Sequence, residues 1–504
     1  MVDIECHLSN NLPAIVIVGF ANRAVHEAQE RVRGAFASCG LEMPRRRITI
    51  NLAPADIPKG SSSFDLAIAA SILQASGGYP GQLRPHQAVM GELGLDGAVR
   101  PVRGIIGKIL AGRNIGITTF FIPAANLPQA ALVPGVTLVP LGSLSELAQY
   151  LSAGILPECI STGDGTMAIS SNTMSHNSEV GSTQPTLSDI VGQQQAKRAL
   201  EIAAAGGHNL LLSGPPGTGK SMLARSLPSI LPELTREEML EVTHLHSLAS
   251  KDYSRIMTSR PFRAPHHSTS HIAVIGGGTA LRPGEMSLAH RGVLFFDEFP
   301  EFNRPTIEAL RQPLEDRQVV IARANDRLEF PANFILIATA NPCPCGYYGV
   351  ANLQGLASRT CNCTPMAIRN YRSKLSGPIL DRIDLYSDVH EVDHARLLED
   401  SLQDTSDQAV QARVAAARRT QAERFGQAGA LNALMDNRAI KTHAKLSDGA
   451  RTLLDGAGRG LDLSARAYMR TVKVARTIAD LDGSDAIKQA HLAEALQFRS
   501  RAIA

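Results

Sequence analysis

The segment GPPGTGKS, from Gly214 to Ser221, constrains the fold of this 504-residue chain more than any other feature. It follows the apolar run NLLLS at 209–213 and precedes a helical pattern, SMLARSL, at 221–227. A strand, a glycine-rich loop and a helix in this order surround phosphate oxygens with backbone N–H groups at a helix N-terminus. The predicted ATP-binding residues are Gly214, Pro215, Pro216, Gly217, Thr218, Gly219, Lys220 and Ser221. We expect Lys220 to bind the β- and γ-phosphates and Ser221 to contact Mg²⁺.

Two later strand patterns end in polar side chains. GVLFFDEF at 292–299 delivers Asp297 and Glu298, and NFILIATAN at 333–341 ends in Asn341. Acids at the carboxyl end of a buried parallel strand stand where a nucleotide site needs them. We predict that Asp297 holds Mg²⁺ with Ser221, that Glu298 polarises the attacking water, and that Asn341 orients this water or contacts the γ-phosphate.

Length and composition predict an α/β protein with several domains, because 504 residues suffice for about three domains. Residues 1–160 alternate strand and helix patterns, including a helix at 21–40 that Gly40 ends. The stretch 161–186 is rich in Ser, Thr, Gly and Asn without apolar periodicity, which predicts a flexible linker. Residues 187–390 hold the phosphate loop and both strands that end in polar side chains, and helical patterns dominate 391–504.

The amino terminus has no basic segment before an apolar run, so we expect no signal peptide. No uncharged apolar stretch reaches about 18 residues, so no transmembrane helix is expected either. Seven cysteines, with Cys6, Cys39 and Cys159 scattered, are typical of free thiols in a reducing compartment. These features predict a cytoplasmic protein without a membrane partner.

Any contact with nucleic acid has to be local, because the net charge is only +3 and aromatic residues make up 4% of the chain. RQVVIARANDRLEFPANF at 317–334 predicts a β-hairpin with Arg323 and Arg327 beside its tip. These arginines could neutralise DNA phosphates without reading bases, or they could be ordinary surface charges. A second candidate is the insert at 260–285, in which Gly276–Gly278 predict a mobile loop and His266 and His267 are either packed or metal-binding.

In this order, the phosphate loop and the two strands resemble those of AAA+ ATPases, and DIVGQ at 189–193 resembles the adenine-side motif of that family. The resemblance implies two functional arginines. GPILDRID at 377–384 matches the segment with the arginine finger, so Arg382 would reach the nucleotide of the next subunit. LSARAYMRTVKVARTIADL at 463–481 resembles the sensor-2 helix of the lid, with Arg466 at the matching position. Arginines of amphipathic helices also often pair on the surface.

RPFRAPHHSTSHIAVIGGG at 260–278, RPGEMSLAHRGVLFFDEFPEF at 282–302 and the segment 341–384 resemble the magnesium-chelatase-like AAA+ proteins, and the bacterial ComM/YifB group most closely. The resemblance implies a Lon-protease-like domain with the ribosomal S5 domain 2-like fold at 1–160, and a linker at 161–186. It further implies an AAA+ α/β module with an H2 insert and a pre-sensor-1 hairpin at 187–390, and an α-helical, magnesium-chelatase C-terminal-like lid at 391–504.

In function, the resemblance implies an ATP- and Mg²⁺-dependent DNA helicase that promotes branch migration in natural transformation. It would act as a homo-hexamer, which can stack into double rings, on single-stranded, double-stranded or branched DNA without sequence preference. An alternative is a chelatase-type motor that remodels a protein partner. A Lon-like peptidase is disfavoured, because Ser62 stands near the expected nucleophile but Ile106 takes the place of the lysine, with Lys108 two residues on.

Four of the seven cysteines lie near Asn341, as Cys343, Cys345, Cys361 and Cys363. Two Cys-x-Cys pairs separated by fifteen residues can complete a tetrahedral zinc site, and such a site is structural because four sulfurs leave no position for water. Reduced thiols in an exposed loop and a redox pair are the alternatives. A metal would order a long loop that has few apolar residues.

Overall fold

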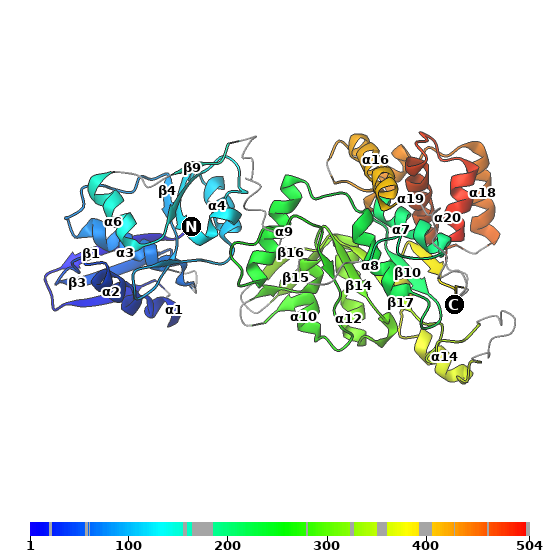
Figure 1. Cartoon of the computed structure of the whole chain (residues 1–504), viewed down its shortest axis with the longest axis horizontal. Helices are drawn as coiled ribbons and strands as arrows, with labels where there is room; N and C mark the ends of the chain where they lie inside the picture. The colour runs from blue at the N-terminus through cyan, green and yellow to red at the C-terminus, as the bar shows by residue number, and fades with distance from the viewer. Residues whose placement is uncertain are drawn as a thin grey trace. The chain divides into compact units, whose positions relative to one another are not determined.

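The computed structural model describes residues 1–19, 23–55, 59, 61–154, 159–163, 185–278, 281–322, 327–349, 360–392, 406–427, 429–460 and 463–499. The chain forms two compact units (Figure 1). The first comprises Met1–Ser178 and Thr235–Met257, and the second comprises Glu179–Leu234 and Thr258–Ala504. The first unit is therefore built from two separate stretches of chain. Most of the predicted linker, residues 164–184, lies outside the described residues.

The first unit is an α/β structure with two main sheets. One has the order β1-β3-β2, with β1 antiparallel and β2 parallel to β3, and the other has the order β4-β7-β8-β9, parallel except at β9. A small antiparallel pair is formed by β5 and β6. The strands are β1 (Asp3–Ser9), β2 (Ala14–Val18), β3 (Arg47–Ala53), β4 (Gln87–Val89), β5 (Glu92–Leu93), β6 (Val99–Arg100), β7 (Thr119–Pro123), β8 (Thr137–Leu141) and β9 (Ile160–Ser161). The helices are α1 (Arg23–His26), α2 (Ala28–Ser38), α3 (Asp65–Ala75), α4 (Ile105–Asn114), α5 (Leu127–Ala130), α6 (Leu144–Ala153) and α9 (Arg236–Ala249).

The helix predicted over 21–40 is divided into α1 and α2 at Glu27. Glu27 keeps helical backbone angles (φ −65°, ψ −17°), so the division interrupts the hydrogen-bond ladder and not the helical backbone. Gly40 follows the helix with φ +66°, a left-handed conformation that favours glycine and ends helices. The predicted glycine stop is confirmed.

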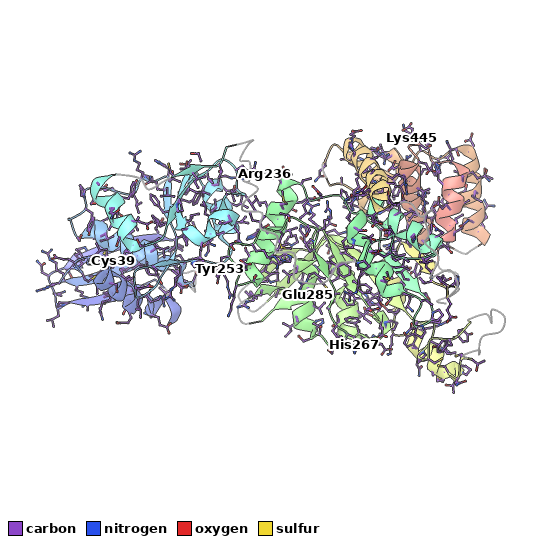
Figure 2. The ribbon with its side chains drawn as sticks, viewed as in Figure 1. Cys39, Arg236, Tyr253, His267, Glu285 and Lys445 are labelled. Carbon is purple, nitrogen blue, oxygen red and sulfur yellow. The ribbon has the colours of Figure 1, made fainter. Side chains whose placement is uncertain are left out.

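Helix α9 packs closely on α4 because α4 presents glycines at the contact. A Cβ at Gly104 would lie 2.7 Å from the Leu248 side chain, and one at Gly107 would lie 2.5 Å from the His244 ring. The chain after α9 is fixed to the same unit, because Gln129 Nε2 donates to the carbonyl of Arg255 at 3.0 Å. Arg236 and Tyr253, labelled in Figure 2, both belong to this stretch.

The second unit is built on a parallel five-stranded sheet with the order β11-β14-β17-β10-β18. Its strands are β10 (Leu210–Ser213), β11 (Phe262–Arg263), β14 (Val293–Phe296), β17 (Ile335–Ala340) and β18 (Leu385–Asp388). Every residue of β14 and β17 is buried, as expected of apolar strands covered on both faces. β10 comes first in the sequence but lies between β17 and β18, so the strand order reverses there. Ligands bind outside the carboxyl ends of strands at such a reversal.

Helices surround this sheet and also form the C-terminal region, as predicted for 391–504. The longer helices are α7 (Gln194–Gly206), α8 (Lys220–Ile230), α14 (Pro365–Arg372), α16 (Asp407–Phe425), α17 (Asn437–His443), α18 (Asp448–Gly460), α19 (Ala465–Leu481) and α20 (Gln489–Gln497). The shorter helices are α10 (His271–Ile275), α11 (Glu285–Leu288), α12 (Arg304–Ala309), α13 (Arg311–Asp316) and α15 (Gly377–Leu380). One apolar core joins the sheet to the C-terminal helices, from Leu210 and Ile337 to Ile478 and Leu492. No described helix is both long and apolar enough to cross a membrane.

Two small antiparallel strand pairs flank β14 in the sequence, one before it and one after it. β12 (Gly276–Gly277) pairs with β13 (Arg282–Pro283) in the insert, and β15 (Gln318–Ala322) pairs with β16 (Arg327–Pro331). The register of the second pair runs from Gln318 opposite Pro331 to Ala322 opposite Arg327. The predicted hairpin at 317–334 is therefore present.

Candidate functional site

The phosphate loop leaves the carboxyl end of β10 and enters α8, as the sequence predicted. Gly217 and Gly219 have φ of +84° and +87°, a left-handed backbone that glycine adopts without steric cost. Gly214 is needed for space instead, because a Cβ there would lie 2.2 Å from the carbonyl oxygen of Val389. The loop thereby places the backbone N–H groups that begin α8 at the edge of the sheet, where they can bind phosphate oxygens.

Lys220 is 9% exposed and occupies the first turn of α8. Its Nζ donates to the carbonyls of Gly214 and Pro215 at 2.7 and 2.6 Å, and to Oδ1 of Asn341 at 3.0 Å. Burial lowers the pKa of Lys220 to about 8, and two nearby carboxylates oppose this shift. The ammonium group therefore joins the phosphate loop to the end of β17.

Asp297 is positioned by strand register. Phe296 pairs with Ala338 in the parallel β14–β17 ladder, so Asp297 follows beside Thr339. Thr339 Oγ1 donates to Asp297 Oδ1 at 2.7 Å, and Ser221 Oγ donates to Asp297 Oδ2 at 2.9 Å. A hydroxyl and a carboxylate in contact are a donor set that fits Mg²⁺, which prefers oxygen ligands.

Glu298 is exposed, and its backbone is left-handed with φ +51°, an uncommon conformation for a residue with a side chain. Its N–H donates to Thr339 Oγ1 at 2.9 Å. Strained backbone of this kind concentrates at functional sites. Sequence reasoning missed Thr339, although a hydroxyl in the buried apolar run ILIATA at 335–340 was a visible signal.

Arg382 follows α15 and does not lie at the phosphate loop. Its side chain is 9% exposed, Nη2 pairs with Glu315 of α13 at 2.5 Å, and Nη1 donates to the carbonyl of Pro378. The structure therefore holds Arg382 within its own chain, and its predicted role at a neighbouring subunit stays a prediction. Arg466 is exposed in the first turn of α19, and its role likewise stays a prediction.

A buried ion pair that the sequence did not reveal joins α19 to the residue before β18. Arg470 Nη1 donates to Asp384 Oδ1 at 2.9 Å, and the N–H of Asn209 donates to Oδ2 at 3.1 Å. His208 Nδ1 lies 3.5 Å from the same oxygen. Burial alone would raise the pKa of Asp384. Arg470 and His208 outweigh this effect and hold the pKa well below its usual range. The sequence did not reveal this ion pair because Asp384 and Arg470 lie 86 positions apart.

The predicted DNA contacts are only partly described. Arg323 lies outside the described residues, whereas the Arg327 side chain is 69% exposed and pairs with Glu329 at 2.9 Å. An exposed pair of this kind contributes roughly 0–1 kcal/mol, so it leaves the cation available to a phosphate.

In the insert, the rings of His266 and His267 lie 4.0 Å apart, and His266 Nδ1 is 2.7 Å from Ser268 Oγ. Near them, Arg263 forms a double hydrogen bond with Glu285, which Figure 2 labels together with His267. Within the described ranges, the one group of His, Cys and acidic side chains suited to a metal is the cysteine cluster. The metal-binding alternative for these two histidines gains no support.

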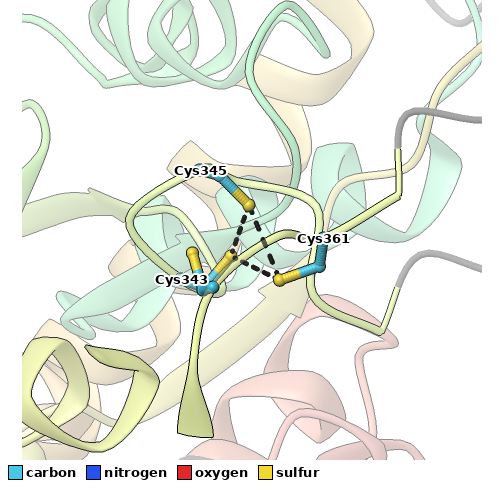
Figure 3. Close-up of side chains that lie close together, drawn as sticks. Cys343, Cys345 and Cys361 are labelled. Atoms are coloured by element: carbon cyan, nitrogen blue, oxygen red, sulfur yellow. Dashed lines mark hydrogen bonds between the residues drawn. The ribbon is translucent and has the colours of Figure 1, made fainter. Parts of the chain in front are cut away.

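The four cysteines after Asn341 form one cluster, and Figure 3 shows Cys343, Cys345 and Cys361 of it. Their sulfurs all lie within 4.8 Å of one another, and Cys343 Sγ is 3.3 Å from Cys345 Sγ and 3.7 Å from Cys361 Sγ. A disulfide needs about 2.05 Å, so these sulfurs are not bonded. Zn–S bonds of about 2.3 Å in a tetrahedron separate the sulfurs by about 3.8 Å. The cluster is therefore compatible with a structural zinc ion.

The sheet order, the phosphate loop and the Ser221–Asp297 pair define a P-loop protein of the AAA+ class. Three family models match the chain: "Magnesium chelatase, subunit ChlI" over 186–397, "Subunit ChlI of Mg-chelatase" over 4–126, and "Magnesium chelatase, subunit ChlI C-terminal" over 404–499. The chain belongs to the ComM/YifB family of magnesium-chelatase-like AAA+ proteins.

Relatives of two kinds support this assignment. Competence protein ComM of Haemophilus influenzae is 42% identical, and YifB of Escherichia coli is 40% identical; each alignment covers 99% of this chain and 94% of the relative. The magnesium-chelatase 38 kDa subunit of Rhodobacter capsulatus is 28% identical over 31% of this chain and 49% of that subunit. The alignments with ComM and YifB span both units, whereas the alignment with the chelatase subunit covers about a third of the chain.

Proposed function

We propose that this protein hydrolyses ATP to drive movement along DNA. The supporting observation is the hydrogen-bonded group at the carboxyl edge of the sheet, in which Lys220 contacts Asn341 and Ser221 contacts Asp297. Lys220 would bind the β- and γ-phosphates, and Ser221 and Asp297 would hold Mg²⁺, which neutralises phosphate charge. Glu298 would polarise the attacking water.

We infer that the working form is a homo-hexamer, in which Arg382 completes the site of the adjacent subunit and Arg466 contributes from the helical lid. Arg382 would have to exchange Glu315 for a phosphate. This exchange is physically reasonable, because the Glu315 side chain is 49% exposed and stays hydrated after it releases the arginine. An arginine finger is worth roughly 10³–10⁵-fold in turnover rate.

We infer that the substrate is DNA and that the process is branch migration during recombination in natural transformation. The support is the full-length similarity to a protein named for competence, together with an exposed arginine on the β15–β16 hairpin. Binding through phosphates alone would be independent of sequence and sensitive to salt. The alternative is a chelatase-type motor acting on a protein partner: the family models of a magnesium-chelatase subunit match most of the chain, whereas the alignment with the 38 kDa subunit itself covers 31% of it.

We propose that residues 1–160 adopt a Lon-like fold without peptidase activity. The Ser62 hydroxyl donates a hydrogen bond to the Glu92 carboxylate. Its partner is therefore an acid and not the lysine of a Ser–Lys dyad. Ile106 is fully buried at the position where the resemblance expects that lysine. Burial lowers the pKa of Lys108 to about 8, but Lys108 lies two residues after Ile106 in α4, about 200° around the helix axis and so on nearly the opposite face.

We also propose that the four-cysteine cluster binds one structural Zn²⁺ ion. Four converging sulfurs without a disulfide are the donor set that zinc prefers, and four protein ligands leave no position for a reacting water.

The discriminating experiment measures ATP turnover without DNA, with forked DNA and with a Holliday-type junction, alongside strand displacement. We expect branched DNA to stimulate turnover several-fold and to be unwound or migrated only with hydrolysable ATP. If none of the DNA substrates changes the rate of ATP turnover and no strand is displaced, the result would favour the protein-remodelling motor instead.

A further inference from the structure

The turn that carries the first two cysteines lies directly against the phosphate loop. The N–H of Gly346 donates to the carbonyl of Cys343 at 3.0 Å and closes the turn. Gly346 is buried with φ +88°, and a Cβ there would lie 2.5 Å from Cδ of Pro216. Pro216 is a member of the phosphate loop, so the cysteine turn and this loop touch without space for a methyl group between them.

The second cysteine pair is joined to α14, and α14 returns to the same site. Thr364, the residue after this pair, caps α14 by accepting a hydrogen bond from the backbone of Ala367. Arg372 of this helix lies over the Tyr348 ring at 5.2 Å, and the backbone of Asn341 acts on the Tyr371 hydroxyl, lowering a pKa that burial raises. The cysteine cluster therefore stands between the phosphate loop, the end of β17 and α14.

A bound metal would stabilise this cluster. Fifteen residues separate Cys345 from Cys361, and closing a loop of this length costs conformational entropy. Four sulfurs gathered within 4.8 Å repel one another once they lose protons, unless a cation lies among them. Metal binding supplies the missing free energy directly as folding free energy.

We propose that zinc bound by the four cysteines presses the Cys343–Gly346 turn against Pro216 and so fixes the phosphate loop in its nucleotide-binding conformation. The proposal rests on the proposed function in one respect, because it assumes that the phosphate loop binds nucleotide. It adds that nucleotide affinity depends on the metal. Zinc here is a positioning group and does not touch the reacting atoms.

The first test measures zinc content by mass spectrometry and the affinity for a fluorescent ADP analogue on the same full-length protein. Protein purified without chelator should hold one zinc per chain. Removing zinc with a strong chelator, or through Cys361→Ser, should weaken nucleotide binding at least tenfold, and restoring zinc to the chelated wild type should restore it. Cys159→Ser, a change at an exposed cysteine outside the cluster, should alter neither quantity.

The second test separates the contact from the metal. Gly346→Ala inserts a methyl group against Pro216. Gly349 has a similar left-handed φ of +75°, but a methyl group added there meets no atom within 4 Å. Gly346→Ala should keep zinc and weaken nucleotide binding several-fold more than Gly349→Ala does.

Two results would overturn the proposal: wild type with under a tenth of a zinc equivalent and four freely titratable thiols, or zinc-free protein with unchanged nucleotide affinity. Zinc-loaded wild type that binds no nucleotide would instead refute the proposed function.

Discussion

Thr339 links the two acids of the site through a single hydroxyl. It donates to Asp297 and accepts from the backbone N–H of Glu298. The same atom therefore orients the expected Mg²⁺ ligand and stabilises the left-handed backbone that presents the next carboxylate. Glu298 itself stays exposed, which its proposed contact with the attacking water requires.

At this scale we predict that Glu298→Gln binds ATP and retains the assembled ring but loses turnover. The change keeps the shape of the side chain and removes the charge that polarises water, which is worth about 10²–10⁴-fold in rate. Phosphate release and nucleotide binding should be measured in parallel. Glu301→Gln, three positions on and also exposed, is the matched control and should retain turnover. Full turnover by Glu298→Gln would exclude the assigned role.

We further predict that Asp384→Asn destabilises the second unit by about 3 kcal/mol at pH 7, because it leaves Arg470 without its buried partner. Five basic groups influence or contact this carboxylate, namely His208, Arg317, Arg470, Lys473 and Arg499, and the Tyr386 hydroxyl also interacts with it. The folded-state pKa of Asp384 is depressed, so its stabilisation is complete above the unfolded-state pKa of about 3.9 and is lost as pH falls toward the folded-state value.

Denaturant unfolding at pH 7, 4 and 3 tests whether the stabilisation by Asp384 decreases as the pH falls. The wild type should lose stability more steeply than Asp384→Asn on going from pH 4 to 3. Asp485→Asn, which removes an exposed carboxylate paired with Lys445, should unfold like the wild type. Equal stability of Asp384→Asn and wild type at pH 7 would contradict the assignment.

At the scale of elements, local patterns were sufficient to predict the strand–loop–helix around Lys220, the two strands that end in polar side chains and the β15–β16 hairpin, because each depends on neighbours in sequence. The contribution of Thr339 could not be read from the sequence, since it depends on the register between β14 and β17. The Asp384–Arg470 pair and the packing of α9 on α4 depend on long-range contacts, which periodicity does not encode. The spacing of the four cysteines predicted their convergence as one of several alternatives, whereas nothing in the sequence indicated the contact between Gly346 and Pro216.

The hairpin carries a prediction of its own. Reversing Arg323 and Arg327 to Glu should weaken DNA binding and uncouple ATP turnover from DNA, because each lost phosphate contact also removes a released counterion. Binding isotherms at several salt concentrations should show a shallower salt slope for the variant. Lys445→Glu, which breaks another exposed ion pair, is the matched control. Unchanged affinity and stimulation would mean that the hairpin is not the DNA contact.

At the scale of the whole molecule, ATP turnover should require assembly. Arg382→Ala should abolish turnover and leave nucleotide binding nearly intact, because Arg382 makes no bond to the phosphate loop of its own chain within the described residues. Mixing Arg382→Ala with Lys220→Ala subunits should restore part of the activity, since some interfaces then contain both groups. Full turnover by a demonstrably monomeric form would exclude the ring.

The two-part composition of the first unit predicts how fragments behave. Leu240 and Ile256 pack, partly buried, against its buried cluster, and full burial of a side chain of this size would stabilise by about 1.5–3 kcal/mol. A fragment of residues 1–178 should therefore self-associate, and a separate peptide of residues 235–257 should bind it and raise its melting temperature. Gly107→Leu in the fragment should prevent this rescue, because the added side chain occupies the position of His244. Light scattering and thermal melts with and without the peptide are the measurements.

The same feature sets an order of events during synthesis. A chain made from its amino terminus exposes residues 1–178 first, but the helix that completes their apolar core follows only after the phosphate loop at 214–221 has been made. Domains that are continuous in sequence can fold one after another as they emerge. This amino-terminal unit has to wait, so its final packing and the first folding steps of the nucleotide-binding unit overlap in time.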